Sequence, residues 1–333
     1  MKLEQMPRYP LLCGFTPLQR MENLEQALGC GPLYIKRDDL TPLGLGGNKT
    51  RKLEFLLGDA LAGGADTLVT VGGVQTNHGR LTAAAAAKAG LACTLVLDGA
   101  RPEKLSGNLL LDCLLGASLV YTDGRSTSAV IEETLAALRA AGRAPYFIPE
   151  GGSNAVGSAG YLAMVPELLA QADSLPVPPA RLVCTMGSLG TFAGLWLGAR
   201  AFGAPFSVTG VAVNPTTGYT REKAAALVNE MSAAYGLDIA AAPQDMDIIY
   251  ADAAHDYAGS GYNVPDAKTR GAVELLARTE GIFLDPCYTA KSFRGFCDIA
   301  RELDGGAIFV HTGGTPALWT QEHLDAFAAD YWN

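Results

Sequence analysis

The chain has 333 residues, of which 49% are hydrophobic and 18% are charged, and its formal net charge is −9. This length and composition allow one large domain or two joined ones and exclude a disordered chain. The acidic balance disfavours nucleic acid and anionic membranes as partners, and no apolar run is long enough to span a bilayer.

The seven cysteines and four histidines are scattered along the chain. The odd number of cysteines and the lack of a CxxC pair predict reduced thiols instead of a disulfide framework. No two histidines stand at metal-ligand spacing, so no metal is expected. The first 20 residues lack the apolar core of a signal peptide, and these features together predict a cytoplasmic protein.

Short runs rich in Val, Ile and Leu alternate along the chain with Ala- and Leu-rich segments of helical periodicity. Strands are expected at 33–36, 67–71, 92–97, 118–121, 145–148, 181–185, 207–212 and 307–310. Helices are expected near 49–62, 77–90, 106–115, 128–141, 155–172, 190–202, 221–235, 266–280, 290–303 and 315–328. This alternation predicts an α/β fold with mostly parallel sheet. Three prolines in 171–185 predict a break between two sheet-building regions, and 214–220 predicts a loop.

Several turns carry the side chains that a ligand site needs. In parallel α/β sheets, ligands bind beyond the carboxyl ends of the strands. Three turns at such ends, and a fourth that precedes a helix, combine glycines with polar residues: VGGVQTNHGR (71–80), CTMGSLGTFAG (184–194), AIFVHTGGTPAL (307–318) and LDPCYTAKS (284–292). Each could be ordinary turn chemistry, but four together favour a binding site.

The turn around residues 187–191 has the composition of a phosphate site. Gly187, Ser188, Gly190 and Thr191 lie between an apolar strand and an apolar helix, where several backbone N–H groups can converge on an anion. The turn lacks the lysine of a Walker loop and the GxGxxG spacing, which makes a nucleotide site a weak alternative. A glycine-rich turn without a ligand remains open at this point.

Lys49 follows Gly46, Gly47 and Asn48 at the expected start of a helix. A lysine that bonds covalently to an aldehyde must first lose its proton, and burial or nearby positive charge lowers its pKa. Asn48 as a helix cap, the helix dipole, and the neighbours Arg51 and Lys52 are expected to supply that charge. The plain alternative is a lysine that points into solvent.

The turn at 71–80 also has two interpretations. Thr76 and Asn77 are good helix-capping residues, so they could simply begin a helix. They could instead present a hydroxyl and an amide to a ligand. A reactive lysine, a phosphate turn and further polar turns together suit pyridoxal phosphate (PLP), which needs a covalent lysine, a phosphate site and groups that tune its ring.

At this point the sequence resembles a known family. The blocks that carry the resemblance are YIKRDDLTPLGLGGNKTRKLEFLLGDAL, GGVQTNHGR, IPEGGSNAVGSAGY, GSLGTFAG, LDPCYTAKS and HTGGTPAL. They look like the D-cysteine desulfhydrase and 1-aminocyclopropane-1-carboxylate (ACC) deaminase family. Those enzymes are PLP-dependent and have the fold of the tryptophan synthase β-subunit. The resemblance runs from about residue 7 to about residue 320, nearly the whole chain.

The resemblance implies roles for matching residues. It makes Lys49 the residue that bonds to PLP, Asn77 a partner of the ring hydroxyl, and residues 187–191 the phosphate ligands. The implied catalytic residues are Lys49, Thr76, Tyr262 and Tyr288. The implied cofactor contacts are Lys49, Asn77, Gly187, Ser188, Leu189, Gly190, Thr191, Thr289 and Thr312. The implied substrate contacts are Thr76, Asn77, His78, Tyr262 and Tyr288.

Two positions separate the branches of this family. ACC deaminases carry Glu and Leu where this chain has Thr289 and Thr312, as D-cysteine desulfhydrases do. A carboxylate near the pyridine nitrogen keeps it protonated, whereas a hydroxyl suits a neutral ring and a substrate that already has a good leaving group. The resemblance therefore implies α,β-elimination from D-cysteine to pyruvate, sulfide and ammonia.

Two residues depart from the family pattern and leave the substrate open. Thr76 replaces the usual serine, and Asn263 stands where glycine is frequent, which requires a left-handed backbone there. L-Cysteate sulfo-lyase and ACC deaminase remain alternatives, and a nucleotide-binding α/β protein without PLP is a remote one. The resemblance further implies a large domain of residues 1–49 plus 166–333, a small inserted domain of residues 50–165, and a homodimer.

Overall fold

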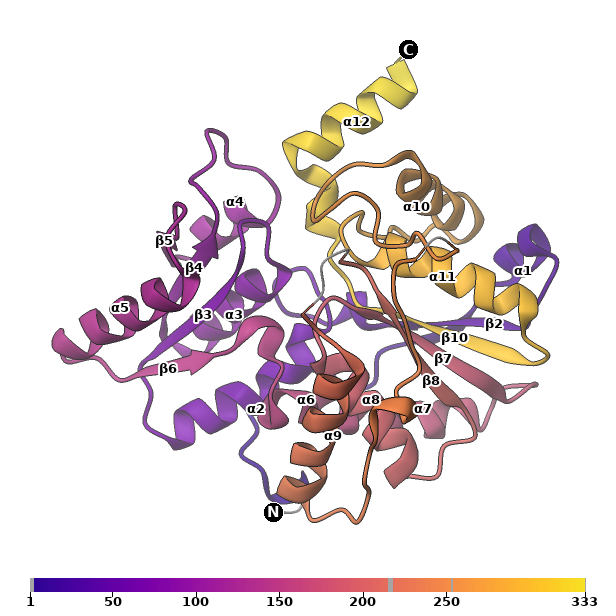
Figure 1. The fold of residues 1–333 in the computed structure, drawn as a ribbon, viewed down its shortest axis with the longest axis horizontal. Coiled ribbons are helices and arrows are strands. Elements are labelled where there is room, and N and C mark those ends of the chain that lie inside the picture. The colour runs from indigo at the N-terminus through magenta and orange to yellow at the C-terminus, as the bar shows by residue number, and fades with distance from the viewer. Residues whose placement is uncertain (1–2, 215–217, 253, 333) are drawn as a thin grey trace.

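The computed structural model describes residues 3–214, 218–252 and 254–332. Among these residues the strands form a six-stranded and a four-stranded sheet, which lie on opposite sides of Figure 1. The predicted α/β class with mostly parallel sheet is confirmed. The loop predicted at 214–220 includes residues 215–217, which lie outside the described residues.

The six-stranded sheet has the strand order β1-β2-β10-β7-β8-β9. Its β1 pairs antiparallel with β2, and the other neighbours pair in parallel. Its strands are β1 (Leu18–Arg20), β2 (Leu33–Arg37), β7 (Pro179–Met186), β8 (Ser207–Ala212), β9 (Ile248–Ile249) and β10 (Gly306–His311). The short strands β1 and β9 were not predicted, because two or three residues show no periodicity.

The four-stranded sheet is parallel throughout and has the order β5-β4-β3-β6. Its strands are β3 (Thr67–Gly73), β4 (Ala92–Asp98), β5 (Ser118–Tyr121) and β6 (Pro145–Ile148). All four lie within the predicted small domain, residues 50–165, and the strands of the larger sheet lie outside it. The domain boundaries themselves stay a prediction.

Helices cover both sheets (Figure 1). They are α1 (Glu22–Leu28), α2 (Lys49–Ala62), α3 (Asn77–Ala89), α4 (Gly107–Leu114), α5 (Thr127–Ala140), α6 (Ala155–Leu162), α7 (Met164–Ala172), α8 (Gly190–Ala201), α9 (Arg221–Tyr235), α10 (Ala267–Glu280), α11 (Thr289–Glu302) and α12 (Gln321–Trp332). Short 3-10 helices are Leu3–Gln5, Asp38–Leu40, Glu150–Gly152, Pro243–Asp245 and Thr315–Trp319. Every predicted helical region contains a helix, and α1 was missed.

Two predicted helices are each divided in the structure. The expected helix 155–172 is split into α6 and α7 at Ala163. Pro166 explains the split, because it has no N–H for a continuous helix and is tolerated only in the first turn of α7. The expected helix 315–328 begins as a 3-10 helix and resumes as α12 after Thr320, whose backbone is extended.

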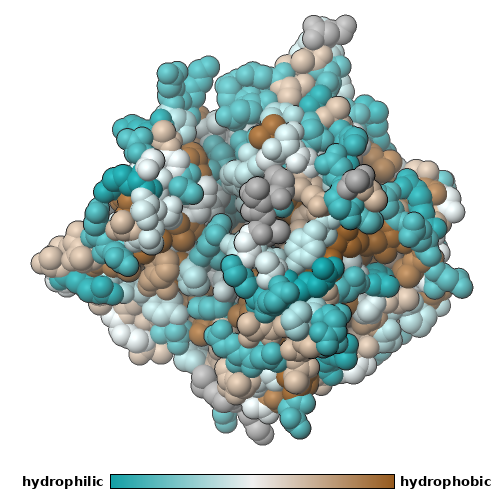
Figure 2. Space-filling model, in the orientation of Figure 1, coloured by the Kyte–Doolittle hydropathy of each residue, from teal (hydrophilic) through white to brown (hydrophobic). Residues whose placement is uncertain are grey.

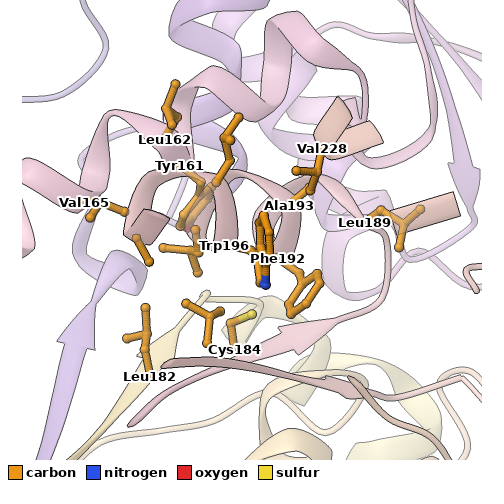
Figure 3. Close-up of a cluster of buried hydrophobic side chains, with 14 of the residues drawn as sticks. Tyr161, Leu162, Val165, Leu182, Cys184, Leu189, Phe192, Ala193, Trp196 and Val228 are labelled. Carbon is orange, nitrogen blue, oxygen red and sulfur yellow. The ribbon is translucent and has the colours of Figure 1, made fainter. Parts of the chain in front are cut away.

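The larger sheet has a hydrophobic core on each face. Leu182 and Cys184 of β7 pack with Phe192 and Trp196 of α8 (Figure 3). Val183, between them in the strand, belongs to a second core that includes residues of α11. Successive strand residues point to opposite faces, so the unbroken apolar run of β7 serves both cores.

The visible surface is largely hydrophilic, with smaller apolar patches between the polar side chains (Figure 2). Among the described residues, no helix combines the length and apolar character that crossing a membrane requires.

A buried ion network fixes the start of α2 to the larger sheet. Arg51 donates from Nε to Asp38 Oδ2 at 2.8 Å and from Nη1 to Glu167 Oε2 at 2.9 Å. Lys36 also pairs with Glu167, and the Tyr161 hydroxyl donates to Asp38 at 2.6 Å. Burial alone would raise the pKa of Asp38, but the Arg51 charge outweighs it and holds that pKa below its usual value.

We expect Glu167→Gln to destabilise the protein by about 3–5 kcal/mol, because it leaves Arg51 and Lys36 buried with too little negative charge. Denaturant unfolding at neutral pH measures this. The matched control is Glu133→Gln, which breaks an exposed pair with Arg125 (52% and 63% exposed) and should leave the midpoint unchanged. Equal effects of the two variants would contradict a stabilising role for the network.

Candidate active site

A pocket opens between the carboxyl ends of strands from both sheets. Its lining residues are Asn48, Lys49, Gly72, Gly73, Thr76, Asn77, His78, Glu150, Gly151, Thr185, Gly187, Ser188, Thr191, Tyr288, Thr312 and Gly313. Segments that are far apart in sequence therefore meet at one place. Of the predicted site residues, Leu189, Gly190, Tyr262 and Thr289 are not part of this lining.

Lys49 is the first residue of α2, and its amine lies inside the pocket. Burial lowers the pKa of Lys49 to about 8. Among its neighbours, Glu150 and Asp285 raise that pKa, whereas the positive charge of Arg80 lowers it further. A useful fraction of this amine is therefore uncharged near neutral pH, as attack on an aldehyde requires.

The source of the positive charge near Lys49 differs from the prediction. Arg51 was expected to contribute, but its charge is engaged by Asp38 and Glu167. Asn48 precedes the helix without capping it through its side chain. Its Oδ1 instead accepts from Lys49 Nζ at 3.0 Å, and its Nδ2 donates to Thr191 Oγ1 at 3.1 Å. Asn48 thus connects the reactive amine to the predicted phosphate turn.

The turn before α8 is arranged to accept an anion. The N–H groups of Ser188 and Leu189 have no hydrogen-bond acceptor among the described residues, and the helix that follows adds its positive end. A Cβ on Gly190 would lie 2.7 Å from Lys52 Nζ and 2.8 Å from Ser158 Oγ, so a larger residue would have to displace these side chains. Lys52, which donates to the Gly151 carbonyl at 2.9 Å, brings a second amine to the same place.

The N-terminus of α3 also lines the pocket. Thr76 is the N-cap, and its Oγ1 accepts from the Gly79 N–H at 3.2 Å, so the capping interpretation is confirmed. Thr76 and Asn77 both line the pocket as well. His78 Nε2 is 2.8 Å from Thr70 Oγ1, and burial lowers the pKa of His78, so the imidazole is neutral.

The two threonines that separate the family branches lie in different surroundings. Thr312 lines the pocket. Thr289 is fully buried at the start of α11, where its hydroxyl donates to Asp285 Oδ1 at 2.6 Å. Asp285 also accepts from the backbone N–H groups of Cys287 and Tyr288, so this carboxylate is held within its own turn.

Tyr288 and Tyr262 lie edge to face, with ring centroids 5.8 Å apart. Tyr288 lines the pocket, whereas Tyr262 lies beside Gly73 in an adjoining outer hollow. Burial raises the pKa of Tyr288, which keeps its phenol protonated. Asn263 has φ +56°, the left-handed backbone that this position was predicted to need.

Sequence reasoning missed several pocket residues. Glu150 and Gly151 follow β6, and Thr185 lies in β7. The glycine pair in the IPEGGSN block, at the carboxyl end of a predicted strand, was the signal that could have located the first two. Thr185 stands in a continuous strand, and nothing in the sequence distinguishes it from a core residue.

The comparisons with known proteins agree with this geometry. A family model described as "Pyridoxal-phosphate dependent enzyme" matches residues 10–313. The chain belongs to this PLP-dependent enzyme family. The remote alternative, a nucleotide-binding protein without PLP, is therefore wrong.

Relatives match over nearly the full length. The chain is 40% identical to a D-cysteine desulfhydrase of Yersinia enterocolitica over 328 residues, which cover 96% of this chain and 97% of the relative. It is 39% identical over 322 residues to a Pyrococcus abyssi protein named "Putative 1-aminocyclopropane-1-carboxylate deaminase". This match covers 95% of this chain and 94% of the relative. These relatives confirm the family that the sequence blocks indicated.

Solved structures are similar as well. A crystal structure of an ACC deaminase homologue matches with a TM-score of 0.88 and 36% identity. The match covers 98% of this chain and 97% of the homologue's chain. A fungal L-serine ammonia-lyase from Rhizomucor miehei has a TM-score of 0.66 at 18% identity, with 96% and 98% covered, and shows the shared fold alone.

The described residues fit PLP. Lys49 offers a buried amine of lowered pKa, Ser188 and Leu189 offer unpaired N–H groups for a phosphate, and Asn48 links Lys49 to Thr191. Asn77 and Thr312 add polar groups to the pocket lining. When bound, PLP withdraws electrons from the amino acid attached to it.

We expect the Lys49 amine of the cofactor-free protein to react with an acylating reagent with a midpoint near pH 8, because burial disfavours its charged form. Labelling at a series of pH values, read by peptide mass spectrometry, measures this. Lys88, exposed on α3, is the internal control for access of the reagent to a lysine. A Lys49 reaction whose midpoint lies well above pH 8 would contradict burial of its amine.

Proposed function

We propose that the chain catalyses PLP-dependent α,β-elimination from a β-substituted amino acid, with D-cysteine as its substrate. With one water, D-cysteine yields pyruvate, sulfide and ammonia. The observation that carries the proposal is the pair of threonines: Thr312 offers a hydroxyl to the pocket, and Thr289 binds Asp285. This arrangement suits a thiol leaving group, which needs a weaker electron sink than a cyclopropane ring.

Each side chain around the pocket has a separate role in the proposed reaction. Lys49 would hold the cofactor and, once free, can take the α-proton on Nζ, since its lowered pKa leaves a useful fraction of the amine uncharged. Thr76 presents its hydroxyl beside it as a contact for the substrate. Asn77 and His78 belong to the same helix start, where backbone N–H groups favour the substrate carboxylate.

Tyr288 is the acid that assists the leaving thiolate. Its phenol lines the pocket, and its raised pKa keeps the proton in place until the sulfur accepts it. Tyr262 packs edge to face against Tyr288 and holds that ring in position from the outer hollow. Together these rings also exclude water from the reacting carbons.

A second candidate is ACC deaminase, which the names given to the Pyrococcus abyssi relative and to the similar crystal structure favour. Its product would be 2-oxobutyrate with ammonia. L-Cysteate elimination, with sulfite as the leaving group, is a third candidate that uses the same residues. The threonine pair favours D-cysteine over ACC, since neither threonine supplies a carboxylate.

We also propose a cytoplasmic homodimer. All seven cysteines are free thiols, as a reducing compartment would keep them. Large apolar side chains such as Phe15, Leu45, Phe283 and Trp319 are more than half exposed, and a second copy of the chain could cover them. Light scattering on the purified protein tests the dimer, and a mass of one chain would exclude it.

We expect purified enzyme to release sulfide and pyruvate from D-cysteine in a panel that includes L-cysteine, L-cysteate, D-serine and ACC. Lys49→Ala should abolish both turnover and the visible absorbance of lysine-bound PLP. If 2-oxobutyrate from ACC is the sole product detected, the threonine argument is wrong. If Lys49→Ala retains turnover and colour, the role of Lys49 is wrong.

Replacing the proposed acid tests the second step. Tyr288→Phe removes the phenolic proton and retains the ring, so kcat for D-cysteine should fall by about 10²–10⁴-fold. The visible absorbance of bound PLP should persist, because the ring still packs beside Gly187. A substrate with a better leaving group, such as β-chloro-D-alanine, should lose less rate. An unchanged kcat for D-cysteine would exclude Tyr288 as the acid.

A further inference from the structure

A fully buried arginine, Arg80 of α3, lies directly behind the pocket and is not part of its lining. Its Nη2 donates to the Gly46 carbonyl at 2.7 Å, in the turn that leads to Lys49. Its Nη1 donates to Asn108 Oδ1 at 2.8 Å and to Asn77 Oδ1 at 3.3 Å. Arg80 therefore reaches the two segments that carry the lysine and the asparagine of the site.

These contacts determine how the Asn77 amide is oriented. Asn77 Oδ1 accepts from Arg80 and also from Asn108 Nδ2, at 2.9 Å. Both groups are donors, so the oxygen must face them and the Asn77 amide nitrogen must face away. That nitrogen has no acceptor among the described residues, and Asn77 lines the pocket. Its N–H groups are free to bind an oxygen of a ligand.

Arg80 also keeps much of its positive charge. Burial lowers the pKa of Arg80 to about 10, so it is still charged at neutral pH. The carboxyl group that acts most strongly on Arg80 is Asp112 of α4, which is fully buried and whose two oxygens have no hydrogen-bond partner among the described residues. Burial raises the pKa of Asp112 to about 7, against the effect of Arg80, so at neutral pH its charge is only partial.

We propose that Arg80 is a positioning residue for the cofactor. It turns the Asn77 amide so that an N–H group points to the PLP ring oxygen, and from behind the Gly46–Gly47 turn it supplies a buried positive charge that favours the anionic form of that oxygen. A purely structural arginine would contribute to stability alone. The proposal depends on PLP binding and not on which amino acid is the substrate.

Other titratable groups face the same region. They are Lys52 on α2, His78 on α3, Glu150 after β6, and Asp285 before α11. Glu150 and Asp285 oppose the effect of Arg80 on Lys49. His78 is neutral. Substitutions at Arg80 and Asp112 leave all four groups in place. Changes in PLP affinity or in the pH midpoint of the absorbance therefore report on Arg80 and Asp112 alone.

The first experiment measures PLP binding to cofactor-free protein by fluorescence titration. Arg80→Met should weaken binding by about 10–100-fold, the effect of losing one charge-assisted hydrogen bond. Arg80→Lys keeps the charge and loses the paired N–H groups, so its loss should be smaller. The matched control is Lys88→Met, which removes an exposed cation from the same helix and should bind PLP like the unaltered protein.

The second experiment follows the visible absorbance of lysine-bound PLP against pH. Arg80→Met should move the midpoint of its transition upward by about one pH unit, because a positive charge near the chromophore is lost. Asp112→Asn removes the opposing carboxyl and should move the midpoint downward. A general loosening of the fold would not move the midpoint upward in one variant and downward in the other.

Unaltered affinity and midpoint in a folded Arg80→Met protein would overturn the proposal. If Arg80→Met fails to fold, the Arg80→Lys and Asp112→Asn variants test the proposal in its place. Weaker binding in the lysine variant with a lowered midpoint in the asparagine variant supports the proposal, and the absence of either effect overturns it. Thermal unfolding of each variant separates a change in stability from a change at the site.

Discussion

Burial of one amine is the constraint on which the rest of the site depends. An exposed lysine would be almost entirely protonated at neutral pH, whereas the lowered pKa of Lys49, about 8, leaves a useful fraction of its amine uncharged. Burial requires polar partners that hold the amine without neutralising its reactivity. Asn48 does this with a neutral carbonyl oxygen, and the carboxylates of Glu150 and Asp285 act on Lys49 without a direct bond. The site therefore combines burial of the amine with little negative charge in direct contact with it.

The first turns of α2 direct neighbouring side chains to different places. Lys49 enters the pocket, Arg51 enters the buried network with Asp38 and Glu167, and Lys52 reaches Gly151 beside the phosphate turn. Successive helical residues are about 100° apart around the axis, so three cations in four positions can serve three functions. The Arg51 network holds α2 against the larger sheet, and this placement keeps Lys49 opposite the Gly187–Thr191 turn.

Strands, helices and the family could be predicted from the sequence because their signals are local. Short apolar runs identified eight strands, and polar residues in turns and at helix starts, among them Lys49, Thr76, Asn77 and Gly187, were singled out and line one pocket. The errors also have local causes. Pro166 divides a helix whose apolar pattern continues, and β1 and β9 are too short to show a pattern. Thr289 had the expected neighbours in sequence, but its hydroxyl is directed to Asp285.

By itself the sequence determined most of the elements that form, the polar turns that meet at the pocket and the cofactor that they suit, since periodicity, glycine placement and residue type act over a few residues. Only the tertiary structure decided which cation affects Lys49, that Asn48 links the amine to Thr191, and that Glu150 joins the pocket. Arg80 is 31 residues from Lys49 in sequence, and Arg51 is two away, yet the distant residue acts on the amine. Coulombic and hydrogen-bond partners depend on distance in space, and packing of the two sheets sets that distance.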